Sequence, residues 1–175
     1  MPQTAVADRM TVGILGQLAD LQSMADASVD TATSEEVTAS IGFGIFVKHG
    51  VGVDSALLPS DPADRLKGIS IQTHEYARDI ELDEDLKLRP GSTFGVLTHG
   101  RVTVAPTTPA APGDEVHVQF DPEVGHPAGA VRATGSAAKT FDITAFAQWR
   151  TVATSAGDLC VLEIDMLNLA LAVVD

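Results

Sequence analysis

The stretch Phe94-Gly-Val-Leu-Thr-His-Gly-Arg-Val-Thr-Val104 decides the fold class of this chain. Its even-numbered positions are apolar, small or β-branched, whereas its odd-numbered positions include His99, Arg101 and Thr103. A period of two is typical of a strand that buries one face. Because Gly100 has no side chain to pack, we expect a bulge or a bend there.

Shorter alternating segments surround this stretch on both sides. Proline and glycine punctuate them, at Pro90-Gly91, at Pro106 and at Pro112-Gly113. The pattern predicts further strands at residues 41–47, 69–74, 116–120 and 159–167. We therefore expect a mainly β fold, either an antiparallel sandwich or a partly closed, jelly-roll-like barrel.

The predicted strand at residues 41–47 carries Gly42 and Gly44 on one face. Glycines on one face of a strand allow another backbone to approach closely. We expect that face to pack against a second segment or a second subunit.

We divide the chain into an N-terminal arm of residues 1–35 and a β-domain of residues 36–175. Ile14, Leu15 and Leu18 share one face of a possible short helix, but Gly13 and Gly16 weaken a helix there. We favour an extended arm that becomes ordered on a neighbouring molecule. The alternative is that the same side chains pack on their own domain.

The charge of the chain excludes some classes of partner. The sequence has 24 acidic residues against 11 Lys and Arg, a formal net charge of −13. Nucleic-acid binding depends on basic groups that neutralise phosphates, so we expect neither a nucleic acid nor an anionic membrane surface as partner. No basic segment precedes a long apolar run, and no run approaches the roughly 20 apolar residues that span a bilayer.

No motif of catalysis or cofactor binding stands out. Cys160 is the single cysteine, and its place on the apolar face of residues 159–167 indicates an inert core thiol. The five histidines are scattered, and no two have helical ligand spacing. We expect no catalytic residue, no cofactor and no metal, although histidines of distant strands leave a metal site open.

Seven short motifs, in their order along residues 40–165, resemble the structural cement, or head-decoration, proteins of tailed bacteriophages. The motifs lie at residues 41–47, 57–59, 66–69, 96–102, 112–116, 146–149 and 161–164. The resemblance implies a non-enzymatic protein, often a trimer at threefold positions, that clamps neighbouring major capsid subunits. It implies synthesis in the bacterial host cytoplasm and a place on the outer surface of the virion.

The resemblance and the residue pattern together give a set of candidate contacts. We expect capsid or subunit contacts at Ile14, Leu15, Leu18, His99 and Arg101. The expected partners are the major capsid protein and other copies of the chain, most simply a homotrimer. We expect the apolar tail at residues 167–174 to be buried either in the domain or against another subunit, because an exposed apolar terminus promotes aggregation.

Three other functions remain open at this stage. One is a different virion component of similar β architecture, such as a tail or head–tail joining protein. Another is a small ligand-binding β module, and the third is an enzyme that uses scattered histidines and carboxylates.

Overall fold

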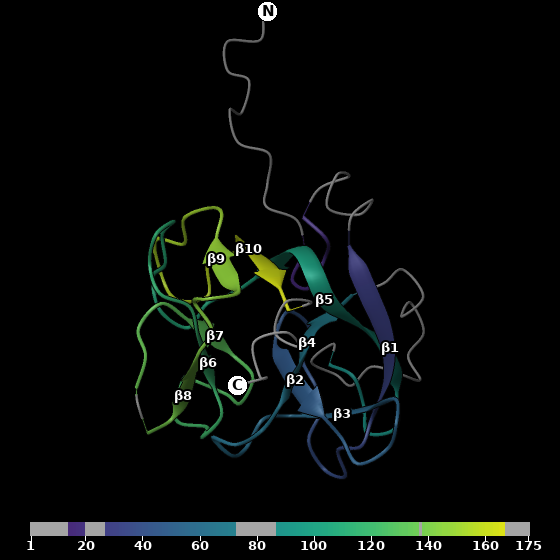
Figure 1. Ribbon diagram of the computed structural model, residues 1–175. Coiled ribbons are helices and arrows are strands. Elements are labelled where there is room, and N and C mark those ends of the chain that lie inside the picture. The colour runs from purple at the N-terminus through teal and green to yellow at the C-terminus, as the bar shows by residue number, and fades with distance from the viewer. Residues whose placement is uncertain (1–13, 20–26, 73–86, 137, 167–175) are drawn as a thin grey trace, which may run out of the picture.

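The computed structural model describes residues 14–19, 27–72, 87–136 and 138–166, and within them the chain forms strands and no helix (Figure 1). This confirms the predicted mainly β fold. The strands are β1 (Ser28–Ser34), β2 (Phe46–His49), β3 (Ser55–Leu57), β4 (Leu66–Ile71), β5 (Thr93–Val104), β6 (His117–Gln119), β7 (Val131–Arg132), β8 (Thr140–Asp142), β9 (Ala147–Trp149) and β10 (Cys160–Asp165).

Five of these strands close into a small barrel. The larger sheet has the order β1-β3-β2-β4-β5-β10-β9, and β1 also pairs with β5, so the first five strands form a ring. Only the β1–β3 pair of this sheet is parallel. Strands β6, β7 and β8 form a separate three-stranded sheet. Of the two predicted alternatives, sandwich and partly closed barrel, the structure has the partly closed barrel, extended by β10 and β9.

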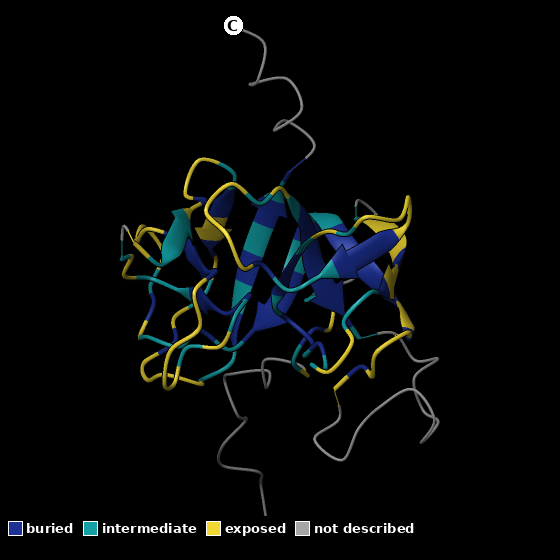
Figure 2. Ribbon diagram, turned by 90° about the horizontal axis from the view of Figure 1, so that it is seen from below, coloured by how far each residue is buried: buried dark blue, intermediate teal, exposed yellow. Residues whose placement is uncertain are grey.

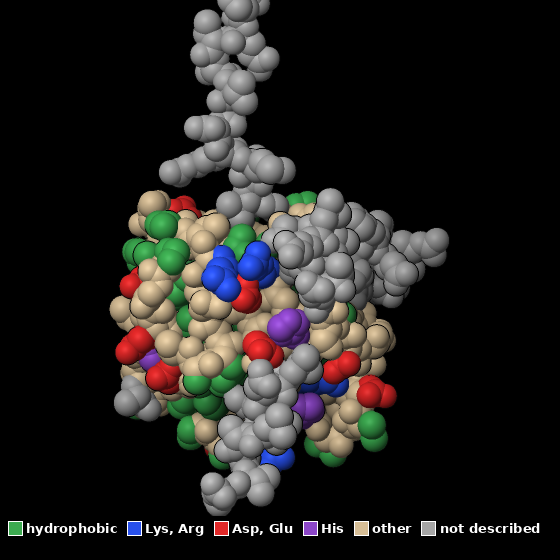
Figure 3. Space-filling view, turned by 45° about the horizontal axis from the view of Figure 1, so that its top comes forward, with side chains coloured by type: hydrophobic (Ala, Val, Ile, Leu, Met, Phe, Trp, Pro, Cys, Tyr) green, Lys and Arg blue, Asp and Glu red, His purple; other side chains and the backbone are tan. Residues whose placement is uncertain are grey.

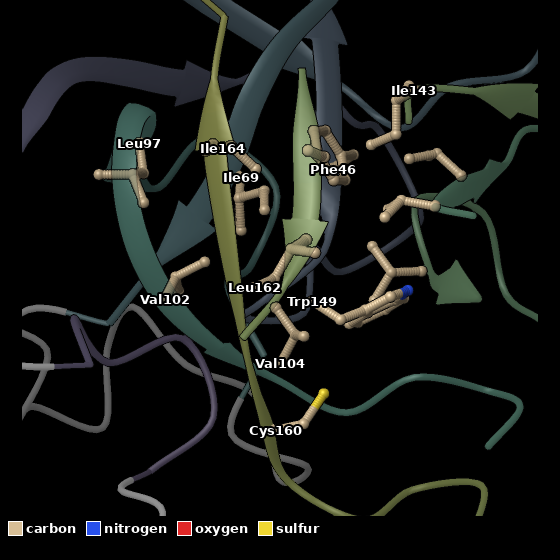
Figure 4. Packing of buried hydrophobic residues seen from close by; sticks show 14 of the residues in the cluster. Phe46, Ile69, Leu97, Val102, Val104, Ile143, Trp149, Cys160, Leu162 and Ile164 are labelled. Atoms are coloured by element: carbon tan, nitrogen blue, oxygen red, sulfur yellow. The ribbon is translucent and has the colours of Figure 1, made fainter. Parts of the chain in front are cut away.

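Two hydrophobic clusters fill the molecule. The smaller one lies inside the barrel and includes Val47, Phe94 and Val96, with Ile41 and Leu88 packed against them. The larger cluster joins the outer wall of the barrel to β9, β10 and the three-stranded sheet. Its labelled members in Figure 4 are Phe46, Ile69, Leu97, Val102, Val104, Ile143, Trp149, Cys160, Leu162 and Ile164. Exposed residues gather in the loops, as Figure 2 shows.

Strand β5 changes the direction of its side chains halfway along its length. Phe94 and Val96 belong to the cluster inside the barrel, whereas Val102 and Val104, also even-numbered, belong to the larger cluster outside it. Leu97 is buried in the larger cluster as well. The prediction of one buried face along the whole stretch is therefore wrong for its first half.

A β-bulge causes the change. Opposite β1, Ser28 pairs with His99 and Val29 pairs with Leu97, which leaves Thr98 as the extra residue of β5. The Thr98 hydroxyl donates a hydrogen bond to the Ser28 carbonyl oxygen at 3.1 Å. An extra residue shifts the two-residue alternation by one. The bulge predicted at Gly100 thus lies at Thr98 instead, while Gly100 itself has a positive φ of 131°.

The predicted strand at residues 41–47 is wrong for most of its length. Strand β2 starts only at Phe46, and Ile41 forms an isolated bridge with Leu88. Gly44 has a positive φ of 68°, which a continuous strand does not accommodate. Elsewhere β4, β6 and β10 lie within or close to their predicted ranges, while residues 73–74 and the tail at 167–174 lie outside the described residues.

Candidate functional site

The outer face of the second half of β5 carries charged side chains. His99 and Arg101 lie on β5, and the register of β10 places Asp165 opposite His99 and Glu163 opposite Arg101. Val102 and Leu162, which alternate with them, point into the larger cluster. In Figure 3, basic, acidic and histidine side chains lie close together on one face of the molecule.

Two arginines share one carboxylate at the centre of this face. Arg150 donates to both oxygens of Glu163, from Nε at 2.8 Å and from Nη2 at 2.6 Å. Arg101 also pairs with Glu163, and the Gln148 side-chain amide donates to it at 3.3 Å. The hydrogen bonds from Arg150 and then Arg101 lower the pKa of Glu163 to about 2. We call Arg101, Arg150 and Glu163 the arginine pair site.

The predicted contact residues His99 and Arg101 thus lie on one face, each beside a carboxylate. His99 Nδ1 is 3.2 Å from Asp165 Oδ1, and about a third of the His99 side chain is exposed to solvent. The sequence missed Arg150 and Glu163 as members of the site. The alternation of residues 159–167 places Glu163 on the polar face, but only the strand register shows which side chain it meets.

Residues 14–19 pair with the second half of β5, on the same side of β5 as β1. Gly16 and Gln17 exchange backbone hydrogen bonds with Thr103, and the Ala19 amide donates to the Arg101 carbonyl oxygen at 3.0 Å. The docking depends on a close approach of Gly16 to Gly44, since a Cβ on Gly16 would lie 2.7 Å from Phe43 Cβ and 3.1 Å from the Gly44 backbone nitrogen. This is the close packing that we expected at Gly44, and in the structure a segment of the same chain provides it.

The three apolar contact candidates of this segment differ in exposure. Leu15 packs against the cluster inside the barrel, and Leu18 packs against the larger cluster and bridges to Val102. The Ile14 residue is 61% exposed. A role of all three as anchors on a neighbour stays a prediction, and Ile14 is the one whose side chain projects into solvent.

The predicted boundary between arm and domain also stays a prediction, because residues 1–13 and 20–26 lie outside the described residues. Within the described part, Ser28–Ser34 is strand β1 and closes the barrel by pairing with β5. Any arm that excludes this strand ends before residue 28.

A second surface feature lies in the loop between β2 and β3, outside the contact residues predicted from the sequence. Val51 and Val53 are 97% and 95% exposed. The Glu35 carboxylate accepts hydrogen bonds from the amides of Val51 and Gly52, both at 2.8 Å. These bonds lower the pKa of Glu35. The available signal was the pattern Gly-Val-Gly-Val at residues 50–53, two apolar side chains inside a glycine-rich turn.

The described residues contain little that could serve catalysis. Among them, no group of three His, Cys, Asp or Glu side chains could hold a metal ion. Cys160 is fully buried, and this burial raises the pKa of its thiol to about 12, so the thiolate nucleophile is disfavoured. In the part of the chain that the structure describes, no helix is long and apolar enough to cross a membrane.

Comparisons with known proteins identify the family. No curated protein matches the sequence. Among solved structures, a chain of "The capsid of Myoviridae Phage XM1" has a similar fold, with a TM-score of 0.60 and 14% identity over 93% of this chain and 96% of that one. Residues 1–165 match the family described as structural cement protein (E217 gp24/Pam3 gp6). The chain therefore belongs to the structural cement protein family and is a structural protein of a phage virion.

Proposed function

We propose that this protein binds the outer surface of a phage capsid and cements neighbouring major capsid subunits, without enzymatic activity. The family match along residues 1–165 carries the proposal, because it spans both the barrel and the strands that present the arginine pair site. The similarity in fold to a chain of a phage capsid structure extends over nearly the same length.

The electrostatics of the chain agree with docking on a protein surface. A formal net charge of −13 disfavours contact with DNA and favours encounter with a basic surface. The arginine pair site is a local exception, with two guanidinium groups around one carboxylate. We assign this site, together with His99, to contacts with an acidic part of the capsid or of another copy.

We propose a homotrimer as the unit that decorates the capsid. The apolar stretch at residues 167–174 follows Met166 and supplies surface for self-association. Repetition of a weak contact around a trimer raises the affinity for a symmetric capsid through avidity. Sedimentation at micromolar concentration tests this proposal, and a monomer both in solution and on the particle would contradict it.

A pair of truncations tests whether residues before Ile14 act as an arm. If residues 1–13 act as an arm, their deletion should leave the domain folded while particle binding weakens. Deleting residues 1–20 also removes the hydrogen bonds of Gly16 and Gln17 to Thr103 and the packing of Leu15 and Leu18, so it should lower the melting temperature. Unchanged particle binding after the shorter deletion would show that residues 1–13 do not hold the protein on the capsid.

Reconstitution on heads tests the function itself. Heads assembled from the major capsid protein of the same phage, without this protein, should bind it saturably and retain packaged DNA to a higher temperature. An unrelated acidic protein of similar size serves as the control for nonspecific charge effects. The proposal fails if saturating protein leaves the release temperature of the DNA unchanged.

A further inference from the structure

We propose that the valine loop, residues 50–54, is an apolar plug that inserts into an apolar hollow with a basic rim on a major capsid subunit. This inference rests on the proposed function and assigns one of its contacts to a specific loop. The loop connects β2 to β3 at one end of the barrel.

The valine loop exposes apolar side chains that the fold itself does not use. Val51 and Val53 are almost fully exposed, at 97% and 95%, and neither belongs to a hydrophobic cluster. Two almost fully exposed valines therefore lie in one loop, and apolar side chains exposed together at one site are a feature of interaction surfaces.

The loop is held in one conformation before any partner binds. Glu35 fixes the amides of Val51 and Gly52, while the Ser55 hydroxyl donates to the Gly52 carbonyl oxygen at 2.9 Å. The Gly50 amide donates to the Ser55 carbonyl oxygen at 3.1 Å. A loop that is already ordered loses little conformational entropy on binding, so the burial of its valines contributes more fully to affinity.

Glycine is required for this arrangement. A Cβ on Gly50 would overlap the Ser55 hydroxyl and the Glu35 carboxylate, and a Cβ on Gly52 would lie 3.0 Å from Glu35 Oε1. The tight turn thus brings the carboxylate under the loop and directs Val51 and Val53 outward. Glycines thus occupy the two positions that contact Glu35, and valines occupy the two exposed positions.

The charge around the loop indicates the chemistry of its partner. Residues 50–54 contain one acid, Asp54, and no base, and the Glu35 carboxylate binds the amides of the loop. The bases Arg65 and Lys67 act electrostatically on His49, directly before the loop. A second copy docked through the same loop would bring Asp54 against Asp54. A capsid surface with basic residues around an apolar hollow complements both the valines and Asp54.

The test compares full-length variants for binding to heads assembled from the major capsid protein. The double variant Val51→Ser, Val53→Ser should bind at least tenfold more weakly than the wild type, because each valine contributes about a tenfold factor when buried. Its melting temperature should not change, since neither side chain packs in the fold. Val124→Ser is the matched control, because Val124 is fully exposed on a different turn and should leave the affinity unchanged.

Glu35→Gln tests whether the hydrogen bonds of Glu35 to the loop amides contribute to binding separately from the valine side chains. A glutamine amide presents only one acceptor oxygen to the two amides of Val51 and Gly52, so the loop loosens while its valines remain. We expect a loss of affinity smaller than that of the double valine variant, and a faster backbone amide exchange at residues 51 and 52.

The outcomes distinguish this inference from the proposed function. If the wild type binds heads and the double valine variant binds equally well, the plug is wrong and the cement function stands. If the double variant loses self-association instead, the loop is an interface between copies, and the inference is overturned. If the wild type itself does not bind heads, the proposed function fails, and the plug fails with it.

Discussion

The two halves of strand β5 differ in how far their two faces are buried. From Phe94 to Leu97 both faces are buried, one inside the barrel and the other in the larger cluster. From His99 to Val104 one face is packed, while the other carries His99 and Arg101 to solvent. The bulge at Thr98 separates the halves.

This difference shows how one strand serves both stability and surface chemistry. The first half is the part of the barrel wall that the larger cluster covers from outside, so neither of its faces meets water and polar side chains are disfavoured on both. The second half packs against the larger cluster with one face only, so its other face is available for charged groups. A single extra residue is sufficient to convert one role into the other.

The largest expected effects come from core truncations in the first half. Phe94→Ala should lower the free energy of unfolding by about 3–5 kcal/mol and Leu97→Ala by about 2–5 kcal/mol, although the two side chains point to opposite faces. Arg101→Ala, in the second half, should change it by less than about 1 kcal/mol. Urea unfolding measures all three, and a nearly neutral Leu97→Ala would contradict the two-faced burial of the first half.

The difference between two glycine substitutions next to the first half is a smaller effect. A Cβ on Gly68 of β4 would overlap the Leu97 carbonyl oxygen, and its φ of 155° is one that other residues rarely adopt. Gly91 also has a positive φ, but a Cβ there meets nothing within 4 Å. Gly91→Ala should cost about 1–2 kcal/mol from its backbone conformation alone. Gly68→Ala should cost about 1–3 kcal/mol more through overpacking, and equal losses of stability would contradict the tight β4–β5 contact.

The sequence predicts the second half of β5 better than the first, for a physical reason. Alternation reports burial correctly where one face meets water, as at Arg101 and Val102. Where both faces are buried, apolar and polar residues no longer alternate, so the sequence does not distinguish the two faces. A bulge then moves the following side chains to the opposite face. The wrong strand at residues 41–47 has a related cause, because Gly44 stands where a strand pattern continues but its positive φ makes a turn.

The candidate site was predictable only in part. His99 and Arg101 stand on the polar side of a predicted strand, so the sequence alone could select them. Arg150 and Glu163 join Arg101 through pairings between strands distant in the chain, which the sequence does not specify. The docking of Leu15 and Leu18 on their own domain depends on the contact of Gly16 with Gly44, which is likewise a tertiary feature.

The smallest effect concerns the pH dependence of the second half. The pKa of Glu163 is lowered to about 2 in the folded protein from an ordinary value of 4.5. Its contribution to stability is therefore complete above about pH 4.5 and is lost as the pH falls toward 2. Because the two arginines are well exposed, the contribution should stay below about 1 kcal/mol.

Glu163→Gln isolates this contribution. The variant should lose about this amount of stability near neutral pH and approach the wild type near pH 2, measured by urea unfolding across that range. If the difference between variant and wild type is independent of pH, the arginine pair site does not hold the carboxylate ionised. Gln148→Ala is the control, because it removes a neutral partner of the same carboxylate.

A reconstruction of the particle by electron microscopy shows where this protein binds. We predict density for the barrel on the outside of the capsid, in contact with at least two major capsid subunits at each position. Density in the tail, in the head–tail connection or inside the shell would contradict it.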